Sequence, residues 1–401
     1  MSTVPPTIER AAGAGTPPRG RLRGLFVNLV LLAVSGLLTL AGFELVLRAF
    51  PGLLGEEAAL RVHWLEVAGD TDSEGRALMV DDPEIGFLYR PGVEGRIARG
   101  DLDFRFRLDS KGFRNPEPWP EPAGIVVLGD SMAFGYGADD GADWVSRLRA
   151  RLPGVGIVNL GLIGSGPLQQ ERIFERFAAA LRPSVVLLCL FAGNDLDDDR
   201  AFARWLEHGA RGSYRRFRGQ GDRWLDDSLL GLAQRTYLFW FANDLAKALA
   251  QRSRGRTLAL EDGERLQLVL PRTSAIDPAD LERTSGAVLR LRERIESSGG
   301  RFAVLLMPTK EEVYLPLAGE QAPSPSAAVA ERLARRGVEA LDLGGVLRGR
   351  ATRRGPALYF AIDGHPNAKG QAIVAEAVHG WLVERWPSLA TSGSVGPAVA
   401  H

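Results

Sequence analysis

The segment around residue 131 places a hydroxyl group where a catalytic nucleophile could stand. The apolar residues 125–128 precede Gly129-Asp130-Ser131, and an apolar run followed by Gly-Asp is typical of a buried strand that ends in a sharp turn. Open α/β sheets carry their chemistry at the carboxyl ends of such strands. Ser131 is therefore a candidate nucleophile, provided that the chain also supplies a general base and oxyanion donors.

Three later segments hold further residues of interest, and two of these segments also follow apolar strands. They contain, in order, Gly164 in the glycine-rich loop 161–166, Asn194 after the apolar run 185–191, and Asp363 and His365 just before an expected helix at 367–384. Each segment alone is a weak signal, because glycine, serine, aspartate and asparagine are ordinary turn residues. Together with the segment around Ser131 they make four segments, and four in this order form a more specific pattern.

This set resembles the four sequence blocks of the SGNH (GDSL-type) hydrolase superfamily, and the likeness spans roughly residues 125–386 with a long insertion inside it. The resemblance implies an α/β fold, a flavodoxin-like three-layer α/β/α arrangement with a parallel central sheet. It implies acyl chemistry in which Ser131 attacks an ester carbonyl and His365 acts as general base and acid, while Asp363 holds the imidazole tautomer. This mechanism is expected to use no cofactor and no metal ion.

The same resemblance assigns the oxyanion hole to the backbone N–H groups of Ser131 and Gly164 and to the side-chain amide of Asn194. Acyl transfer needs such fixed donors where negative charge develops. A glycine at 164 suits this role because no side chain stands between its N–H and the substrate. The alternative for Asn194 is a simple turn or helix cap.

The spacing of Asp363 and His365 departs from the usual pattern of the superfamily. Most members have Asp-x-x-His, whereas this chain has Asp363-Gly364-His365. The shorter spacing resembles the branch associated with polysaccharide O-acetylation, including alginate acetylation proteins. This resemblance directs the expected substrate towards acetyl esters of sugars.

Two of these segments also allow other interpretations. The glycine-rich loop 161–166 could hold a dinucleotide phosphate, but its glycines are in the wrong order for the Gly-x-Gly-x-x-Gly fingerprint. The acidic run at residues 195–199 could bind a divalent cation. A helix that begins with acids near its positive dipole end is the favoured interpretation.

An uncharged stretch near the N-terminus predicts a membrane anchor. No charged residue occurs from Gly24 to Phe43, which is about the 20 residues that a spanning helix needs. Four arginines precede this stretch and are opposed by a single glutamate, so the positive-inside rule places the N-terminus in the cytoplasm. We expect an uncleaved signal anchor in the bacterial inner membrane with the catalytic domain in the periplasm; a cleaved signal peptide is the alternative.

Composition narrows the expected partners. The net charge is zero, which argues against nucleic-acid binding because such proteins usually carry a basic surface. The single cysteine, Cys189, lies in an expected core strand, so neither an intrachain disulfide nor a zinc cluster of cysteines is possible. Lysine occurs only at Lys111, Lys247, Lys310 and Lys369, a bias that we attribute to codon composition. Protein partners stay open.

Strand and helix patterns alternate along the chain and predict a parallel sheet with helices on both faces. Expected strands are 124–128, 156–159, 184–190, 301–307 and 338–342, and expected helices are 143–152, 167–181, 278–297, 324–336 and 367–384. The expected organisation is a disordered cytoplasmic tail (1–23), a transmembrane anchor (24–47), an extracytoplasmic lead-in with short strands (48–120), the hydrolase domain in two parts (121–199 and 277–388), an insertion between them (200–276), and a disordered tail (389–401).

The insertion follows Asn194 closely, so we expect a mainly helical cap over the active site, with two short strands near 256–270. Its aromatic residues are most simply the core of a small subdomain. The alternative is a sugar-stacking rim with basic neighbours that meet anionic glycans or lipid headgroups, formed by Tyr214, Phe217, Trp224, Arg215, Arg216 and Arg218.

The function expected from the sequence is that of a membrane-anchored serine esterase or O-acyltransferase acting on O-acyl groups of cell-envelope carbohydrate. Hydrolysis and transfer share the acyl-enzyme and differ in whether water or a hydroxyl acceptor takes the acyl group. Two alternatives stay open. One is a lipase or thioesterase that uses the same residues on lipid esters, and the other is a catalytically inactive glycan-binding protein of the same fold.

Overall fold

The chain divides into two units, Met1–Leu53 and Leu54–His401. The computed structural model describes residues 19–55, 58, 62, 78–99, 101–221, 232–233, 236–249, 255–270, 276–320 and 324–391. All the candidate site residues lie in the second unit.

The first unit consists of a long apolar helix, α1 (Arg19–Ala49), followed by the 3-10 turn η1 (Pro51–Leu53). Within it, Arg23–Ala49 has a mean hydropathy of 2.2 and is long and apolar enough to cross a membrane. Signal sequences also satisfy this criterion. The expected anchor at residues 24–47 lies inside α1.

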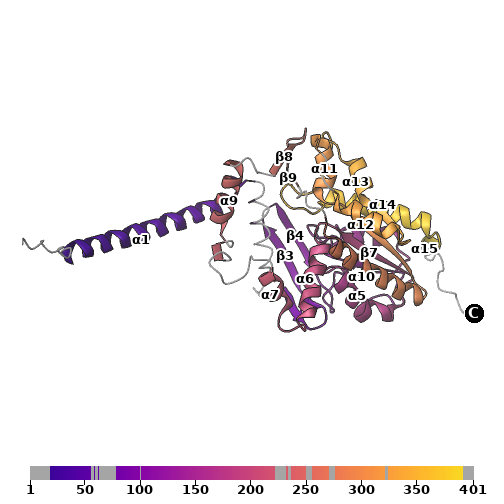
Figure 1. Cartoon of the computed structure of the whole chain (residues 1–401). Coiled ribbons are helices and arrows are strands. Elements are labelled where there is room, and N and C mark those ends of the chain that lie inside the picture. Colours follow the sequence, from indigo (N-terminus) through magenta and orange to yellow (C-terminus); the bar gives the residue numbers. More distant parts are fainter. Residues whose placement is uncertain are drawn as a thin grey trace, which may run out of the picture. The chain divides into compact units, whose positions relative to one another are not determined.

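A five-stranded parallel sheet forms the centre of the second unit (Figure 1). Its strand order is β11-β10-β7-β5-β6, which is 2-1-3-4-5 read from β6 with the strands numbered along the chain. The strands are β5 (Ile125–Gly129), β6 (Ile157–Asn159), β7 (Val185–Phe191), β10 (Arg301–Met307) and β11 (Ala340–Asp342). This is the flavodoxin-like order, whose switch point between the first and third strands is the usual place for a ligand. Here those strands are β5 and β7.

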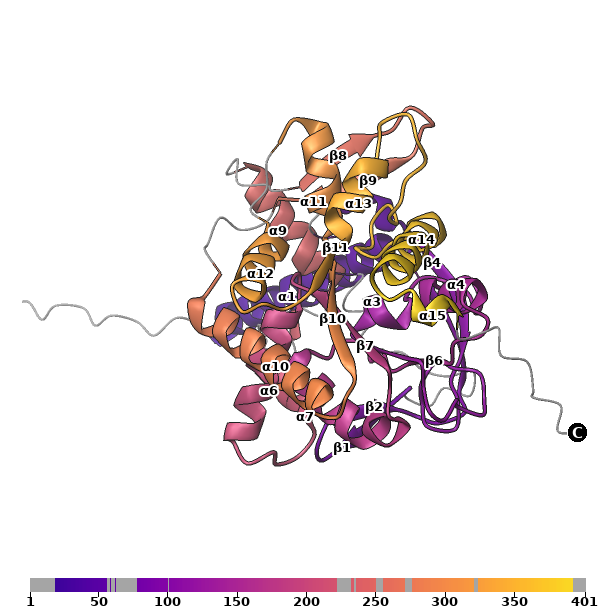
Figure 2. The ribbon, with the colours of Figure 1, turned by 90° about the vertical axis from the view of Figure 1, so that its right-hand side faces the viewer.

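Helices cover both faces of the sheet (Figure 2). One layer contains α5 (Pro167–Ile173), α6 (Asp195–Glu207), α10 (Pro278–Ser297) and α12 (Pro325–Ala334). The other contains α4 (Trp144–Arg151), α11 (Lys310–Tyr314), α13 (Leu343–Arg350) and α14 (Ala368–Arg385), with the short α15 (Ser388–Thr391) after it. The three-layer α/β/α fold expected from the sequence is confirmed.

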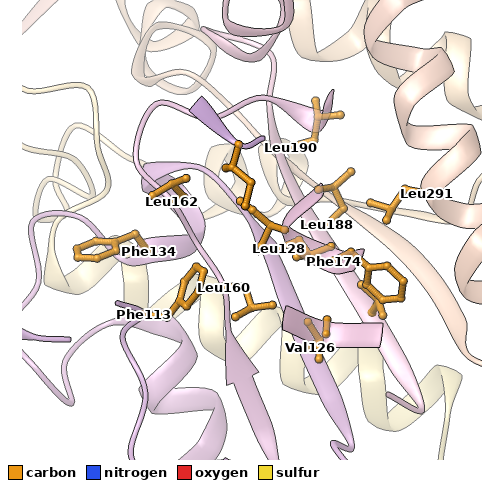
Figure 3. Close-up of a cluster of buried hydrophobic side chains, with 14 of the residues drawn as sticks. Phe113, Val126, Leu128, Phe134, Leu160, Leu162, Phe174, Leu188, Leu190 and Leu291 are labelled. Atoms are coloured by element: carbon orange, nitrogen blue, oxygen red, sulfur yellow. The ribbon is translucent and has the colours of Figure 1, made fainter. Parts of the chain in front are cut away.

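The sheet separates two hydrophobic cores, because successive side chains of a strand point to opposite faces. Val126 and Leu128 of β5 belong to the core on the α10 side, whereas Ile125 and Val127 belong to the core on the α14 side. Figure 3 shows the first core, in which Leu291 of α10 meets the side chains of β5 and β7. A strand buried on both faces is continuously apolar, which explains why these strands were predictable.

The described part of the lead-in contains two antiparallel hairpins. Their strands are β1 (Met79–Asp82), β2 (Gly86–Tyr89), β3 (Glu94–Arg99) and β4 (Leu102–Arg107). In β4, Leu102, Phe104 and Phe106 are buried while the residues between them are exposed, as the alternating sequence predicts. Phe106 packs edge-on against Phe134, with ring centroids 5.4 Å apart. The lead-in therefore packs directly against the segment that follows Ser131.

Beyond the end of α6, the described part of the insertion includes two helices and a hairpin. These are α7 (Tyr214–Gly221), α9 (Tyr237–Leu249), β8 (Gly255–Ala259) and β9 (Arg265–Val269). The hairpin confirms the two strands expected near 256–270. It lies against the segment before Asp363, since the Gln267 N–H donates to the carbonyl of Ala361 at 2.8 Å. The domain boundaries and the role of the insertion as a cap stay predictions.

Two local differences from the expected elements have clear causes. The helix expected at 167–181 is α-helical as far as Ile173 and then continues as a π turn and a 3-10 turn, ending at Arg182 with a φ of 44°. Helix α13 was not expected, because its three glycines lower its helix propensity. Burial of Leu343 and Leu347 stabilises it nonetheless.

Candidate active site

Ser131 lies where β5 turns into the short helix α3 (Ser131–Phe134). Gly129 ends the strand with a φ of 144°, and a Cβ at this position would lie 2.5 Å from the carbonyl oxygen of Cys189. Glycine is therefore required at this turn. Asp130 caps the helix, and its Oδ1 accepts a hydrogen bond from the Met132 N–H at 2.9 Å. As the first residue of a helix, Ser131 has a backbone N–H without an intrahelical acceptor.

The structure brings Ser131, His365 and Asp363 together although 234 positions separate the serine from the histidine. His365 Nε2 lies 2.7 Å from Ser131 Oγ, and His365 Nδ1 lies 2.6 Å from Asp363 Oδ1. The same Oδ1 also accepts the backbone N–H of His365 at 2.8 Å. The three residues are buried, with exposed fractions of 4%, 3% and 0%. This arrangement can pass a proton from the hydroxyl to the imidazole and stabilise the resulting imidazolium.

Opposing influences act on the pKa of His365. Burial lowers it, because the charged imidazolium loses contact with water. The charge of Asp363, the hydrogen bond to it and the charge of Asp130 outweigh burial, so the pKa of His365 is raised above its ordinary value. Burial also raises the pKa of the Asp130 carboxyl. His365 is therefore a stronger base than a free imidazole.

Gly164 lies in the loop that runs beside the end of β5. This loop is attached to the strand because the Leu162 N–H donates to the carbonyl of Gly129 at 2.9 Å. Gly164 has a φ of 71°, in the left-handed region that favours glycine. Within the described residues, the N–H groups of Ser131 and Gly164 have no hydrogen-bond acceptor. Both are thus available as donors.

Asn194 is connected to Ser131 through Asp130. Its Nδ2 donates to Asp198 Oδ2 at 3.3 Å, and its side chain also hydrogen bonds to Asp130. Ser131 Oγ in turn lies 3.4 Å from Asp130 Oδ2. No hydrogen bond joins Asn194 directly to Ser131 in the described part of the chain. The structure thus places Asn194 at the site, with its amide turned towards carboxylates.

An arginine of the insertion links two of these elements. Arg218 of α7 donates from Nη1 to the carbonyl of Gly164 at 2.7 Å, and its Nη2 forms an ion pair with Asp198. Because Asp198 also accepts from Asn194, Arg218 connects the loop of Gly164 with the start of α6. The sequence carried no signal for this contact, since its acceptor is a backbone carbonyl.

The acidic residues at the start of α6 have partners inside the protein. Asp195 accepts the Phe191 N–H at 2.8 Å, and Asp199 accepts the Leu168 N–H at 2.9 Å and the Thr284 hydroxyl at 2.8 Å. Burial raises the pKa of Asp199 to about 7 and that of Asp195 well above its ordinary value. The predicted helix start is confirmed, and no group of three or more potential metal ligands occurs among the described residues.

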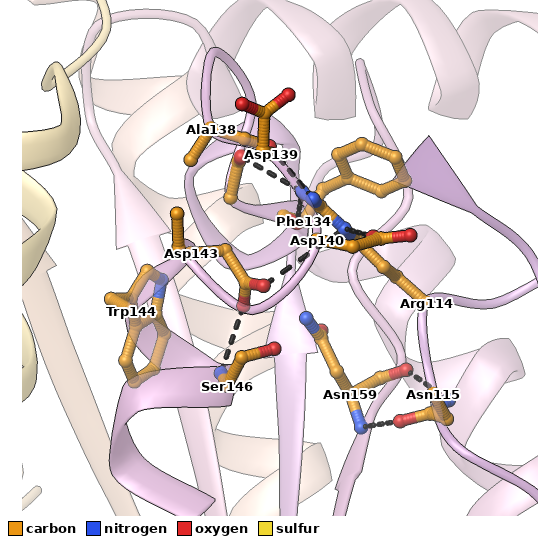
Figure 4. A network of polar contacts seen from close by, with 12 residues as sticks. Arg114, Asn115, Phe134, Ala138, Asp139, Asp140, Asp143, Trp144, Ser146 and Asn159 are labelled. Atoms are coloured by element: carbon orange, nitrogen blue, oxygen red, sulfur yellow. Dashed lines mark hydrogen bonds and ion pairs between the residues drawn. The ribbon is translucent and has the colours of Figure 1, made fainter. Parts of the chain in front are cut away.

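A buried arginine from the lead-in supports the turn after α3 (Figure 4). Arg114 donates to the carbonyls of Gly135 at 3.1 Å and Ala138 at 2.7 Å, and it pairs with Asp140 at 2.9 Å. Its side chain is 4% exposed. Charge-assisted hydrogen bonds from this buried guanidinium hold the backbone at residues 135–138 in place. The sequence analysis missed this residue because its partners lie more than 20 positions away.

The cavity beside Ser131 and His365 is small. It is bordered by Ser131, His365, Tyr136, Trp144 and other side chains, and its volume is about 10 Å³, which is room for about one water molecule. The rings of Tyr136 and His365 pack with centroids 4.7 Å apart. Space on this side of Ser131 is therefore limited to a very small group.

The alternative of a sugar-stacking rim is wrong for Tyr214. This side chain is fully buried and stacks in parallel on Phe87 with ring centroids 6.0 Å apart. It also packs edge-on against Phe202 at 5.3 Å. The apolar environment of the first core accounts for this placement, because an aromatic ring stabilises the folded state more when it is buried than when it is exposed to water. Trp224 and the side chain of Arg216 lie outside the described residues.

Comparison with known proteins shows the family of the chain. The model of the GDSL-like lipase/acylhydrolase family matches residues 127–373. The chain belongs to this family. The match includes every candidate site residue from Ser131 to His365. No curated protein matches the chain.

Several solved structures are similar to part of this chain. A member of the lipolytic G-D-S-L family from Veillonella parvula is 14% identical over 66% of this chain and 97% of its own, with a TM-score of 0.34. The enzyme LAE5 from the metagenome of Lake Arreo is 15% identical over 69% and 98%, with a TM-score of 0.37. The acetyl xylan esterase AlAXEase is 10% identical over 64% and 99%, with a TM-score of 0.36.

Proposed function

We propose that this member of the GDSL-like family is a serine esterase or O-acyltransferase that works through Ser131, His365 and Asp363. The observation that carries the proposal is the continuous chain of short contacts, 2.7 Å from Ser131 Oγ to His365 Nε2 and 2.6 Å from His365 Nδ1 to Asp363 Oδ1. These lie within the range expected for a nucleophile, its base and the group that orients the base.

In the proposed reaction, Ser131 Oγ attacks the ester carbonyl carbon while its proton passes to His365 Nε2. The tetrahedral oxyanion is bound by the N–H groups of Ser131 and Gly164, and the amide of Asn194 turns from its carboxylate partners to join them. The bond to the alcohol oxygen breaks as His365 returns the proton to that oxygen. Water or an acceptor hydroxyl then attacks the acyl-Ser131 ester, and the proton passes through His365 back to Ser131.

We infer that the acyl group is small, with acetyl esters of cell-envelope carbohydrate as the preferred substrates. The cavity of about 10 Å³ beside Ser131 and His365 leaves no room for a long alkyl chain on that side. The Asp-x-His spacing, which resembles that of the polysaccharide O-acetylation branch, supports it too. A lipase or thioesterase would need a path for an alkyl chain past the same residues.

The first experiment combines a fluorophosphonate probe with ester hydrolysis by the purified full-length protein. We expect the probe to label wild type at Ser131, a Ser131→Ala variant to be neither labelled nor active, and acetyl esters to be cleaved faster than octanoyl esters. Labelling that persists in Ser131→Ala would contradict the assignment of the nucleophile. Absence of labelling in wild type would support an inactive binding protein, and a preference for octanoyl esters would support the lipase alternative.

We also propose that α1 anchors the protein in the inner membrane with the catalytic unit in the periplasm. The apolar segment Arg23–Ala49 and the arginines before it support this orientation. A reporter that is active only outside the cytoplasm, fused after His401, should be active, and the protein should stay with membranes after a high-salt wash. Release of a shortened soluble form would instead indicate a cleaved signal peptide.

A further inference from the structure

Lys310 occupies an unusual position next to the segment that carries Asp363. It is the first residue of α11, directly after the turn that follows β10, and its exposed fraction is 2%. Its Nζ lies 3.3 Å, 3.2 Å, 2.9 Å and 3.1 Å from four backbone carbonyl oxygens, those of Phe360, Ala361, Ile362 and Asp363. An ammonium group has three N–H donors, so the four carbonyls share them.

The four carbonyls belong to consecutive residues, and their convergence on one point requires a cation at that point. Successive carbonyls of an extended chain point in alternating directions, whereas here residues 360–363 curve so that all four oxygens face one point. Four carbonyl dipoles aimed at one point repel one another unless a positive charge lies between them. A buried ammonium supplies that charge, and the carbonyls compensate for the water that it loses.

The opposite edge of the same segment is held by a carboxylate. Asp101, in the turn between β3 and β4, accepts the Ile362 N–H at 2.7 Å and the Asp363 N–H at 3.4 Å. A cation therefore holds the carbonyl side of the segment and an anion holds its N–H side. The two groups come from distant elements, and they converge on the residue that orients His365.

We propose that Lys310, together with Asp101, is a positioning residue for the Asp363–His365 pair. The inference rests on the proposed catalytic role of that pair. The shorter Asp-x-His spacing leaves one residue, Gly364, between the two side chains, so the direction of the preceding backbone determines where the carboxylate of Asp363 lies. Clamping residues 360–363 from both sides keeps Asp363 Oδ1 within hydrogen-bond distance of His365 Nδ1.

The experiment is a double-mutant cycle on the full-length protein between Lys310→Met and Asp363→Ala. Methionine keeps most of the length of the lysine side chain and removes its charge. We expect Lys310→Met alone to lower kcat by about 10- to 100-fold with little change in KM, because a misplacement of about 1 Å can cost ~10²-fold. In the Asp363→Ala background the same substitution should lower kcat by less than about threefold, because the interaction that it supports is already absent.

The matched control is Lys369→Met, which removes an exposed lysine two positions after the cap of α14 and should leave kcat unchanged. Equal losses from Lys310→Met in both backgrounds, or no loss in either, would overturn the inference. If Lys310→Met fails to fold by circular dichroism, Asp101→Ala takes its place in the cycle. Asp101 is partly exposed in a turn, and its substitution should also lower kcat in wild type and not in Asp363→Ala.

The cycle separates this inference from the proposed function. A wild-type protein that neither reacts with the fluorophosphonate probe nor cleaves esters would remove the proposed function itself. An active wild type with additive losses from Lys310 and Asp363 would leave the proposed function in place and remove the positioning role.

Discussion

An Asp363→Asn variant would exchange the carboxylate next to His365 for a neutral amide of the same shape. In wild type a single oxygen, Oδ1, accepts both the backbone N–H of His365 at 2.8 Å and Nδ1 of the same residue at 2.6 Å. An asparagine that places its amide oxygen there keeps both hydrogen bonds. The opposite orientation would set the NH₂ group against the backbone N–H, donor against donor. We therefore expect the imidazole tautomer to be preserved and the negative charge to be lost.

The expected magnitude follows from that difference. A hydrogen bond to a charged group contributes about 1.5–3 kcal/mol, and one between neutral groups about 0.5–1.5 kcal/mol. The loss of about 1–2 kcal/mol corresponds to about 5- to 30-fold in kcat. Asp363→Ala removes the acceptor altogether and no longer fixes the tautomer, which in a Ser-His-Asp site can cost ~10⁴-fold. Asparagine should therefore be much less damaging than alanine.

The assay is kcat on an acetyl ester for wild type, both Asp363 variants and Asp262→Asn, which carries the same change in the exposed β8–β9 turn. Circular dichroism and thermal unfolding verify that each variant is folded. A loss of ~10⁴-fold in Asp363→Asn would refute the argument that Oδ1 fixes the amide orientation. A well-folded Asp363→Asn within about threefold of wild type would show that its charge is not used, leaving a dyad of Ser131 and His365.

Three further predictions address the base and the oxyanion hole. The general base must be neutral, and the pKa of His365 is raised above 6.5. The value of kcat/KM should therefore fall towards acid pH with a midpoint above 6.5, and this midpoint should move to lower pH in Asp363→Asn. A midpoint that does not move would contradict the role of the Asp363 charge. Asn194→Ala should lower kcat by about 10²- to 10³-fold without loss of folding, whereas an unchanged kcat would restrict the Asn194 side chain to its hydrogen bonds with Asp198 and Asp130. Arg218→Met should lower kcat by about tenfold, because the loop of Gly164 loses its link to α6; unchanged kinetics with wild-type stability would argue that this link is not used.

Local sequence patterns were sufficient to predict the strands of the sheet and the main helices around it. Strands β5 and β7 are continuously apolar because each is buried between two layers of helices. Helix α10 (Pro278–Ser297) coincides with the expected helix, since Asp277 caps it and proline opens it. Ser131 and Asn194 each follow a strand of a predicted parallel sheet, so the sequence predicts that both lie at its carboxyl edge, and the structure pairs these two strands directly.

The sequence by itself determined which residues are chemically able to form the site, because Ser131 follows an apolar strand and the Asp363–His365 pair comes just before a helix, in the order of the family's sequence blocks. The tertiary structure alone decided which groups hold them in place. Lys310 binds four backbone carbonyls, Arg218 binds the carbonyl of Gly164, and Asp101 binds backbone N–H groups. Every residue carries a carbonyl and nearly every one an N–H, so such contacts leave no signature in the local sequence. They arise only when the hairpin of the lead-in and the turn after β10 fold against the segment that bears Asp363 and His365, and when α7 of the insertion folds against the loop of Gly164.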